Sequence, residues 1–482
     1  MSFVSLTFLV FLAAVFGLYW ARPTKGWQNC VVLGASYTFY GWWDWRFCFL
    51  MLASSLVDYF AGVAIYGTSN ATRRKAYLVA ALSCNLAVLG IFKYFDFFAD
   101  SLAISLALAG IEISTPTFHI LLPVGISFYT FQTMSYTIDI YRGHFEPQRS
   151  VIDYLSFVSF FPQLVAGPIE RATNLLPQFR SARSFSFDEA QTGMRLVLWG
   201  FLKKMLIADN LAAFVDTSFA APQLTSGAAL LLATIFFSFQ IYCDFSAYSD
   251  IAAGVAALFG IRLMRNFAYP YLSQTVTEFW RRWHISLSTW FRDYVYFPLG
   301  GNRVSPARCY RNLLVICVVS GLWHGASWTF VAWGFLHGVY LVIERRLGWN
   351  KMAPRPESAP AAISGLPSVE VLFRILCTYA LVSITWVFFR ASSLEESLLI
   401  LKRIFTAFGS FGEAGSILAA QTWLLGLIAA FVLVEWVGRF HWNPLKFERL
   451  PVFFRWAAYT AAVWAILLFG TRQSEEFIYF RF

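Results

Sequence analysis

The chain has 482 residues, of which 58% are hydrophobic and 13% are charged, whereas roughly 25% of the residues of a typical soluble domain are charged. This composition excludes a single water-soluble core and predicts an all-α, polytopic integral membrane protein. The net charge of +10 would suggest nucleic acid as a partner of a soluble protein, but most of the basic residues lie in loops between apolar runs, which is what the positive-inside rule produces.

Apolar runs recur along the whole chain, and several are shorter than the roughly 20 residues that a perpendicular span needs. We therefore expect about ten to twelve transmembrane helices, with some runs re-entrant or interfacial. The runs are 4–19, 31–43, 49–65, 77–92, 196–202, 228–242, 313–343, 371–389, 423–436 and 456–469. Basic loops follow the first and third runs, so these loops are predicted to be cytoplasmic and both chain termini to lie outside.

Residues 1–110 alternate apolar runs with short basic loops and are predicted to be scaffold helices. The first run lacks a preceding basic region and a small-residue cleavage site, so we interpret it as a retained span. Asp58 is the charge set deepest in one of these runs, and we expect it to hydrogen-bond to a neighbouring helix rather than to carry chemistry.

Residues 115–345 contain nearly all the motifs and many polar or helix-breaking residues in apolar surroundings. Polar and helix-breaking residues at membrane depth predict an internal tunnel, since broken backbone is tolerated only where it is buried or lines a wet cavity. The segment 277–294 mixes arginines with aromatic residues and is typical of a helix in the interface plane. It also carries His284.

An ionisable side chain inside an apolar stretch is a functional-site hypothesis by default, and His324 lies in such a stretch, 321–328. His324 is the expected general base, which takes a proton from a hydroxyl while a second polar group orients an acyl donor. His284, near enough in sequence to meet His324 in the fold, is the other candidate catalytic residue. The alternative is that each is a structural histidine with satisfied hydrogen bonds. His337 follows His324 by 13 residues, at a different angle on an ideal helix, and is expected to pack or support.

Arginines cluster between two apolar regions, over residues 262–311. The cluster suits the phosphates of a cytoplasmic donor, but it equally suits anionic lipids or the positive-inside rule. The residues predicted to bind the donor or to wall its site are Arg281, Arg282, Arg292, Trp323 and Trp328.

No metal site is predicted, because His324 and His337 have no partner four residues on, no glutamate completes a zincin pattern, and Cys317 is isolated. The seven cysteines have no repeated spacing, which argues against a disulfide framework.

Residues 346–482 begin with a Pro/Ala/Ser-rich segment, 352–360, which is predicted to be a flexible aqueous loop, and then return to plain apolar runs. The aromatic tail 477–482 is either an interfacial anchor or a segment that re-enters the tunnel, where Tyr479 briefly accepts or positions the acyl group. Export of acetyl groups by a Tyr479→Phe variant would exclude the second interpretation. The whole chain is interpreted as one membrane domain.

Several of these motifs together resemble the membrane-bound O-acyltransferase family, and within it the bacterial branch that acetylates exopolysaccharides such as alginate. The resemblance covers most of the chain and rests on the segments 122–132, 161–169, 244–250, 280–288, 296–301 and 321–325. It implies that His324 matches the catalytic histidine of the family and His284 its second functional position. It also implies acetyl-CoA as cytoplasmic donor, a transmembrane tunnel, and delivery of acetyl to an outside polysaccharide through a separate periplasmic transferase.

Three alternatives remain open. Within the same superfamily, the chain would transfer D-alanyl groups to teichoic acid from a carrier protein. From a different class, it would be a transporter or channel in which His324, Asp244 and Asp250 form a proton or ion path. It would be a structural scaffold of a polysaccharide-export complex if His324 were inert.

Overall fold

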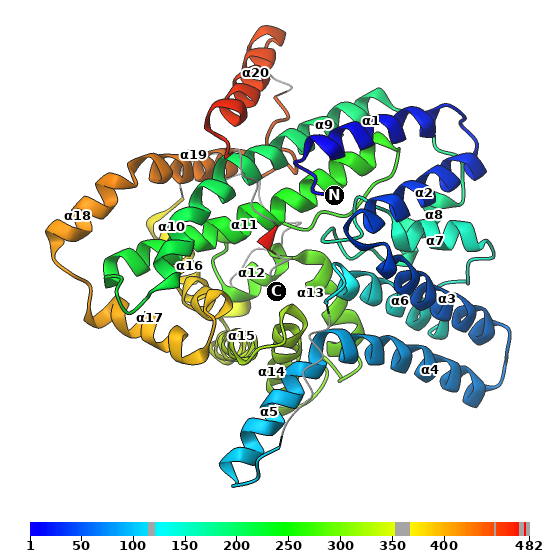
Figure 1. The fold of residues 1–482 in the computed structure, drawn as a ribbon, viewed down its shortest axis with the longest axis horizontal. Coiled ribbons are helices and arrows are strands. Elements are labelled where there is room, and N and C mark those ends of the chain that lie inside the picture. Colours follow the sequence, from blue (N-terminus) through cyan, green and yellow to red (C-terminus); the bar gives the residue numbers. More distant parts are fainter. Residues whose placement is uncertain (114–120, 352–366, 448–449, 472–476, 479–482) are drawn as a thin grey trace. The chain divides into compact units, whose positions relative to one another are not determined.

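A computed structural model describes residues 1–113, 121–351, 367–447, 450–471 and 477–478, and these residues form helices and loops with no β-strand (Figure 1). The predicted loop at 352–360 lies outside the described residues, as does Tyr479. The chain divides into two compact units, residues 1–194 with 252–264, and residues 195–251 with 265–482. The three regions expected from sequence texture stay a prediction, since this division cuts across them.

The first unit is built from helices at the start of the chain, and α3 packs against both α4 and α6. Its helices are α1 (Leu6–Trp20), α2 (Lys25–Asp44), α3 (Arg46–Tyr66), α4 (Ala71–Leu89), a π-helical turn (Gly90–Tyr94), α5 (Phe95–Leu108), α6 (Ile126–Tyr141), α7 (Val151–Ser159) and α8 (Ala172–Phe179). The helix α9 (Phe187–Phe201) begins in this unit and ends in the second.

Asp58 of α3 confirms its predicted structural role. Its carboxylate accepts hydrogen bonds from Thr137 Oγ1 and Asn85 Nδ2, both at 2.6 Å. These donors come from α6 and α4, so the buried charge joins three helices of the scaffold.

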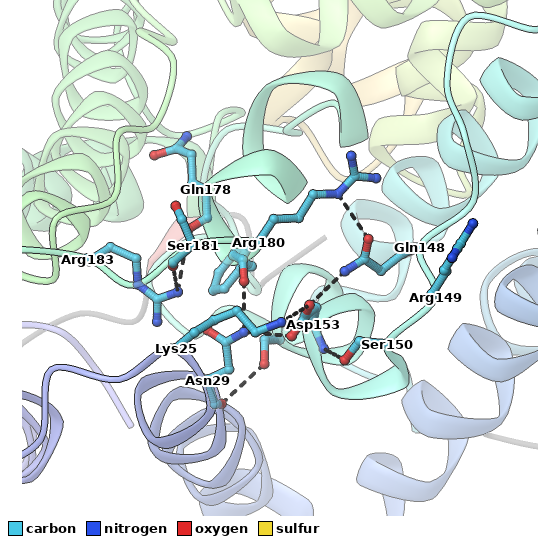
Figure 2. Close-up of polar contacts among 12 residues, drawn as sticks. Lys25, Asn29, Gln148, Arg149, Ser150, Asp153, Gln178, Arg180, Ser181 and Arg183 are labelled. Atoms are coloured by element: carbon cyan, nitrogen blue, oxygen red, sulfur yellow. Dashed lines mark hydrogen bonds and ion pairs between the residues drawn. The ribbon is translucent and has the colours of Figure 1, made fainter.

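A second buried carboxylate, Asp153 at the start of α7, ties α7 to α2 (Figure 2). It accepts hydrogen bonds from Asn29 Nδ2 at 2.8 Å and Gln148 Nε2 at 2.7 Å, and pairs with Lys25 Nζ at 3.1 Å. Gln148 in turn accepts from Arg180 Nε at 3.0 Å. Buried carboxylates are stable only when they are paired and hydrogen-bonded. This network therefore holds α2 and α7 together.

The second unit contains α11 (Gly227–Leu258), whose last residues belong to the first unit, and the candidate site. Its other elements are a π-helical segment η2 (Leu202–Ala208), α10 (Asp209–Ala220), a short turn (Pro270–Leu272), α12 (Val276–Arg282), α13 (Ile285–Phe291), a π-helical turn (Arg292–Tyr296), α14 (Pro306–His324), α15 (Trp328–Leu347), a 3₁₀ turn (Trp349–Lys351), α16 (Val369–Arg390), α17 (Leu394–Thr406), α18 (Phe411–Ala420), α19 (Thr422–Gly438) and α20 (Val452–Phe469).

Five helical segments of the described residues are long and apolar enough to cross a membrane, and six if the pair α18 and α19, bent by 68°, forms one span. They are Arg46–Tyr66, Ala71–Leu108, Gly227–Leu258, Val369–Arg390 and Val452–Phe469. This falls short of the ten to twelve spans predicted, because the long run 313–343 divides into α14 and α15, whose outer turns carry charged residues, and α1 has only 15 residues. The all-helical, multi-pass class is confirmed, whereas the central tunnel stays a prediction.

Candidate active site

Close packing of α14 against α15 sets the position of His324, the last residue of α14. A Cβ atom at Gly321 would lie 2.2 Å from the carbonyl oxygen of Phe330, and one at Gly334 would lie 2.3 Å from that of Cys317. Only glycine fits at these two crossing points, as is usual where helices of membrane proteins approach closely. The sequence around His324 is therefore rich in glycine for a steric reason.

His324 is 4% exposed and lies among aromatic rings. The centroid of its imidazole is 5.0 Å from those of Trp323 and Trp333, both at 82°, and 5.5 Å from that of Phe389. Such edge-to-face contacts restrict the rotation of the imidazole and surround it with apolar carbon. The general-base role of His324 stays a prediction.

The helix α12, which precedes His284, is anchored at its first turn by two carboxylates. Glu344 of α15 accepts hydrogen bonds from the backbone of Val276 and Thr277, while Glu278 accepts from Gln274 N at 2.9 Å. Thr275 caps the helix by accepting from Glu278 N. Negative groups at a helix N-terminus satisfy its free N–H groups and its dipole, so the path of the chain toward His284 is fixed from α15.

His284 has a left-handed backbone, with φ 45° and ψ 54°, in the turn between α12 and α13. It shares this feature with only one other non-glycine residue of the described chain, Tyr269. A strained backbone of this kind costs of order 1 kcal/mol and persists only where the surroundings hold it in place. The strain points to a side chain that is held in one orientation.

Asn266 provides that hold and determines which nitrogen of His284 carries the proton. Its Oδ1 accepts hydrogen bonds from the backbone N–H of Ser286 at 3.1 Å and from Ser286 Oγ at 2.9 Å, while its Nδ2 donates to Ser249 Oγ at 3.1 Å. The atom that faces His284 Nδ1 at 3.2 Å is therefore the amide oxygen, an acceptor. Consequently Nδ1 carries the proton, and the lone pair lies on Nε2.

Burial lowers the pKa of His284 to about 3, because the imidazole is surrounded by protein and the charged form is disfavoured. His284 is thus neutral throughout the physiological pH range. Its Nε2 can accept a hydrogen bond from a ligand such as an amide N–H of an acyl donor.

This lowered pKa predicts a pH dependence of stability. Between pH 6.5 and about 3 the unfolded chain binds a proton at His284 that the folded chain does not, so the free energy of unfolding falls as the pH falls through this window and is unaffected above it. In His284→Gln this contribution is removed. We expect the melting temperature of the wild type to fall more steeply than that of the variant between pH 7 and 4.5, and equal slopes would contradict the assignment.

The structure brings His284 and His324 together although 40 residues separate them in sequence. Their ring centroids lie 6.3 Å apart, and the ring of Trp323 lies 5.9 Å from that of His284. Trp323 therefore contacts both histidines and walls the space between them. Trp328, the other tryptophan predicted to line the site, begins α15 and is 54% exposed.

Two of the three arginines predicted to bind the donor lie on α12, and the third, Arg292, begins the π-helical turn that follows α13. Arg282 is paired with Glu278 at 2.7 Å and also donates to Ala268 O, so its guanidinium stabilises the local fold. Arg281 and Arg292 are both exposed, and Arg292 pairs with its neighbour Asp293. Donor binding by these residues stays a prediction, and Arg281 and Arg292 are the two placed to reach a ligand in solvent.

His337 has the supporting position that its spacing suggests. It accepts from Trp280 Nε1 at Nδ1, at 3.3 Å, and its Nε2 lies 2.9 Å from Thr385 Oγ1. Its ring packs 4.9 Å from that of Trp333, which in turn contacts His324. His337 thus holds the wall of the site in place.

Three further residues matter to this geometry and were missed by sequence reasoning: Asn266, Glu344 and Trp333. Asn266 stands in a loop and Glu344 at the charged end of a helix, where nothing in spacing or periodicity marks them. Trp333 was visible as one of the aromatic residues that follow His324, but only the packing of α15 shows that it contacts the imidazole.

Comparison with known proteins identifies a family. The model of the membrane-bound O-acyltransferase family matches residues 147–349, which include both histidines. A probable alginate O-acetylase of Azotobacter vinelandii is 40% identical over 454 residues, covering 92% of this chain and 87% of the relative.

Two other relatives act on different polymers, according to their names. A peptidoglycan O-acetyltransferase of Helicobacter pylori is 34% identical over 394 residues, covering 76% of this chain and 72% of the relative. A teichoic acid D-alanyltransferase of Streptococcus thermophilus is 30% identical over 257 residues, covering 51% of this chain and 62% of the relative.

Proposed function

We propose that this chain, which belongs to the membrane-bound O-acyltransferase family, moves acetyl groups from cytoplasmic acetyl-CoA across a bacterial inner membrane for O-acetylation of a secreted polysaccharide such as alginate. The observation that carries the proposal is the pair of buried imidazoles, His284 and His324, with ring centroids 6.3 Å apart. The family is one of acyltransferases, so the transporter alternative is no longer needed. The two carboxylates that the transporter alternative would use, Asp244 and Asp250, are held in ion pairs with Lys204 and Lys203.

In this proposal His324 acts as general base. It removes the proton of an attacking hydroxyl, the hydroxyl oxygen forms a bond with the acetyl carbonyl carbon, and the bond to the sulfur of CoA breaks. The proton passes from the imidazole to the departing thiolate, so charge balances over the step. The aromatic rings around His324 exclude water and limit hydrolysis of the thioester.

His284 orients the donor. Because its proton is held on Nδ1 by Asn266, its Nε2 accepts a hydrogen bond, which suits an amide N–H of the pantetheine arm of acetyl-CoA. Arg281 and Arg292, both exposed, are proposed to attract the phosphates of the nucleotide end. Trp323 contacts both histidines and would position the acetyl group.

The extent of similarity favours acetyl over D-alanyl as the acyl group. The two acetyl-transferring relatives align over 92% and 76% of this chain, whereas the D-alanyl relative aligns over 51%. The polymer that receives the acetyl group is proposed to be a polysaccharide reached through a periplasmic acetyltransferase partner, with both chain termini on the periplasmic side. Tyr479, which lies outside the described residues, is proposed to accept or position the acetyl group for handover.

The choice of donor can be tested on the full chain in proteoliposomes. Labelled acetyl-CoA and a D-alanyl thioester of a carrier protein are each supplied on the cytoplasmic face, and free thiol is measured. We expect acetyl-CoA to be consumed at least ten times faster than the D-alanyl thioester, because the proposed donor site binds CoA and not a carrier protein. Consumption of the D-alanyl thioester alone would replace the proposal with D-alanyl transfer.

A further inference from the structure

The second unit contains a buried group of charges that the proposed mechanism does not use. Lys204 of η2 is 1% exposed and pairs with Asp244 Oδ1 at 2.7 Å and with Asp209 Oδ1 at 2.9 Å. Taking such charges out of water costs more than their mutual attraction usually returns, so a buried ion pair is weak as a source of stability and is more often explained by specificity.

The other carboxylate oxygen of Asp244 connects this group of buried charges to residues 477–478. Asp244 Oδ2 accepts a hydrogen bond from the backbone N–H of Ile478 at 2.6 Å, four residues before the last residue of the sequence. The ring of Phe477 lies under Lys204 Nζ, with 4.6 Å between nitrogen and ring centroid, and packs at 84° against Tyr248 with centroids 5.0 Å apart. Phe477 and Ile478 are only 2% and 5% exposed.

These contacts lie on the helix that also contacts His284. Asp244 and Tyr248 stand four residues apart on α11 and so share one face, which receives residues 477–478. Phe245 and Ser249, each one residue further on, face the site: the ring of Phe245 is 4.7 Å from that of His284, and Ser249 accepts from Asn266. The tail and the imidazole therefore contact neighbouring faces of the same turns of α11, about one residue apart around the helix.

We infer that Lys204, Asp244 and Tyr248 form a dock for residues 477–478, and that this dock holds these two residues next to the helix face that orients His284. The two charged residues are positioning residues, since they touch the tail and not the donor. The expected effect on acyl transfer rests on the proposed function. The docking of residues 477–478 is independent of that function.

Docking can be measured without any activity. In a background in which Cys30, Cys48, Cys84 and Cys377 are replaced by serine, Ile478→Cys places a thiol at the dock. We expect a small maleimide to label this thiol at least ten times faster when Asp244→Ala is added, because the backbone hydrogen bond and the charge that fixes Lys204 are both lost. Labelling at the same slow rate would overturn the dock.

A matched control is available on the same helix. Asp250 pairs with Lys203 at 2.7 Å and contacts no part of residues 477–478 among the interactions described here, so Asp250→Asn removes a neighbouring ion pair and is expected to leave labelling at residue 478 unchanged. Phe477→Ala is the second test variant, since it weakens docking while every buried charge keeps its partner. The buried thiols Cys243 and Cys309 report unfolding if they become reactive.

The positioning role is tested by the kinetics of the same variants. Phe477→Ala and Asp244→Ala are expected to lower kcat for acetyl delivery at least tenfold, with KM for acetyl-CoA changed less than twofold. Fast labelling with unchanged kcat would overturn the positioning role and leave the dock. Fast labelling in variants of a chain whose wild type consumes no acetyl-CoA would support the dock and reject the proposed function instead.

Discussion

Replacing His324 with alanine is expected to lower the rate of acetyl-CoA consumption roughly 10²- to 10⁴-fold, the range that a general base contributes. The residue lies among Trp323, Trp333 and Phe389, and the ring centroid of His284 is 6.3 Å from its own. His284 has its proton fixed toward Asn266 and is placed to orient, so it is not expected to replace the lost base. The measurement is release of thiol from labelled acetyl-CoA by the purified chain in lipid.

Two other histidines serve as controls for this result. His144 is exposed, and His144→Ala is expected to leave turnover unchanged. His337→Ala removes contacts with Trp280 and Thr385 and is expected to lower the melting temperature, with a loss of turnover of less than tenfold. Equal rates for wild type and a folded His324→Ala would remove His324 from the chemistry.

The sequence singles out candidate residues for the chemistry better than it shows how they are held. A histidine in an apolar stretch is conspicuous because its burial is costly, and that argument applies to His324 without any structure. The proximity of His284 does not follow from the sequence, because 40 residues with several turns allow many arrangements. The tautomer of His284 depends on one oxygen atom of Asn266, which only the folded chain places.

The same contrast applies to the helices. Asp58 was predicted to bond a neighbouring helix, and it does, because the cost of burying a carboxylate leaves few other outcomes. Of the ten to twelve predicted spans, five or six correspond to helices of the described residues that are long and apolar enough to cross a membrane, since an apolar run does not show where the backbone bends. The run 313–343 contains Gly325 at a break between two helices; α14 begins with a turn that carries Arg308, and α15 ends with a turn that carries Arg345 and Arg346.

The close packing of α14 and α15 gives the prediction with the largest effect on stability. In Gly321→Ala the new methyl group would lie 2.2 Å from the carbonyl oxygen of Phe330, which is backbone and cannot rotate away. The helices must therefore separate, and overpacking of this kind typically costs about 1–3 kcal/mol. We expect a lower melting temperature and a fall in turnover, because His324 ends α14 while Trp333 belongs to α15, and their contact depends on the helix separation.

Gly426 of α19 offers the matched comparison in the same unit. It is also a helical glycine, but a Cβ atom there meets nothing within 4 Å. Gly426→Ala removes backbone entropy from the unfolded chain without a clash, so it is expected to raise stability by about 0.5–1 kcal/mol. Opposite signs of the change in melting temperature for the same substitution would show that helix contact, and not helix propensity, sets the requirement at Gly321. If Gly321→Ala also stabilised the chain, the α14 and α15 crossing would be looser than described, and the aromatic contacts that hold His324 would have to come from elsewhere.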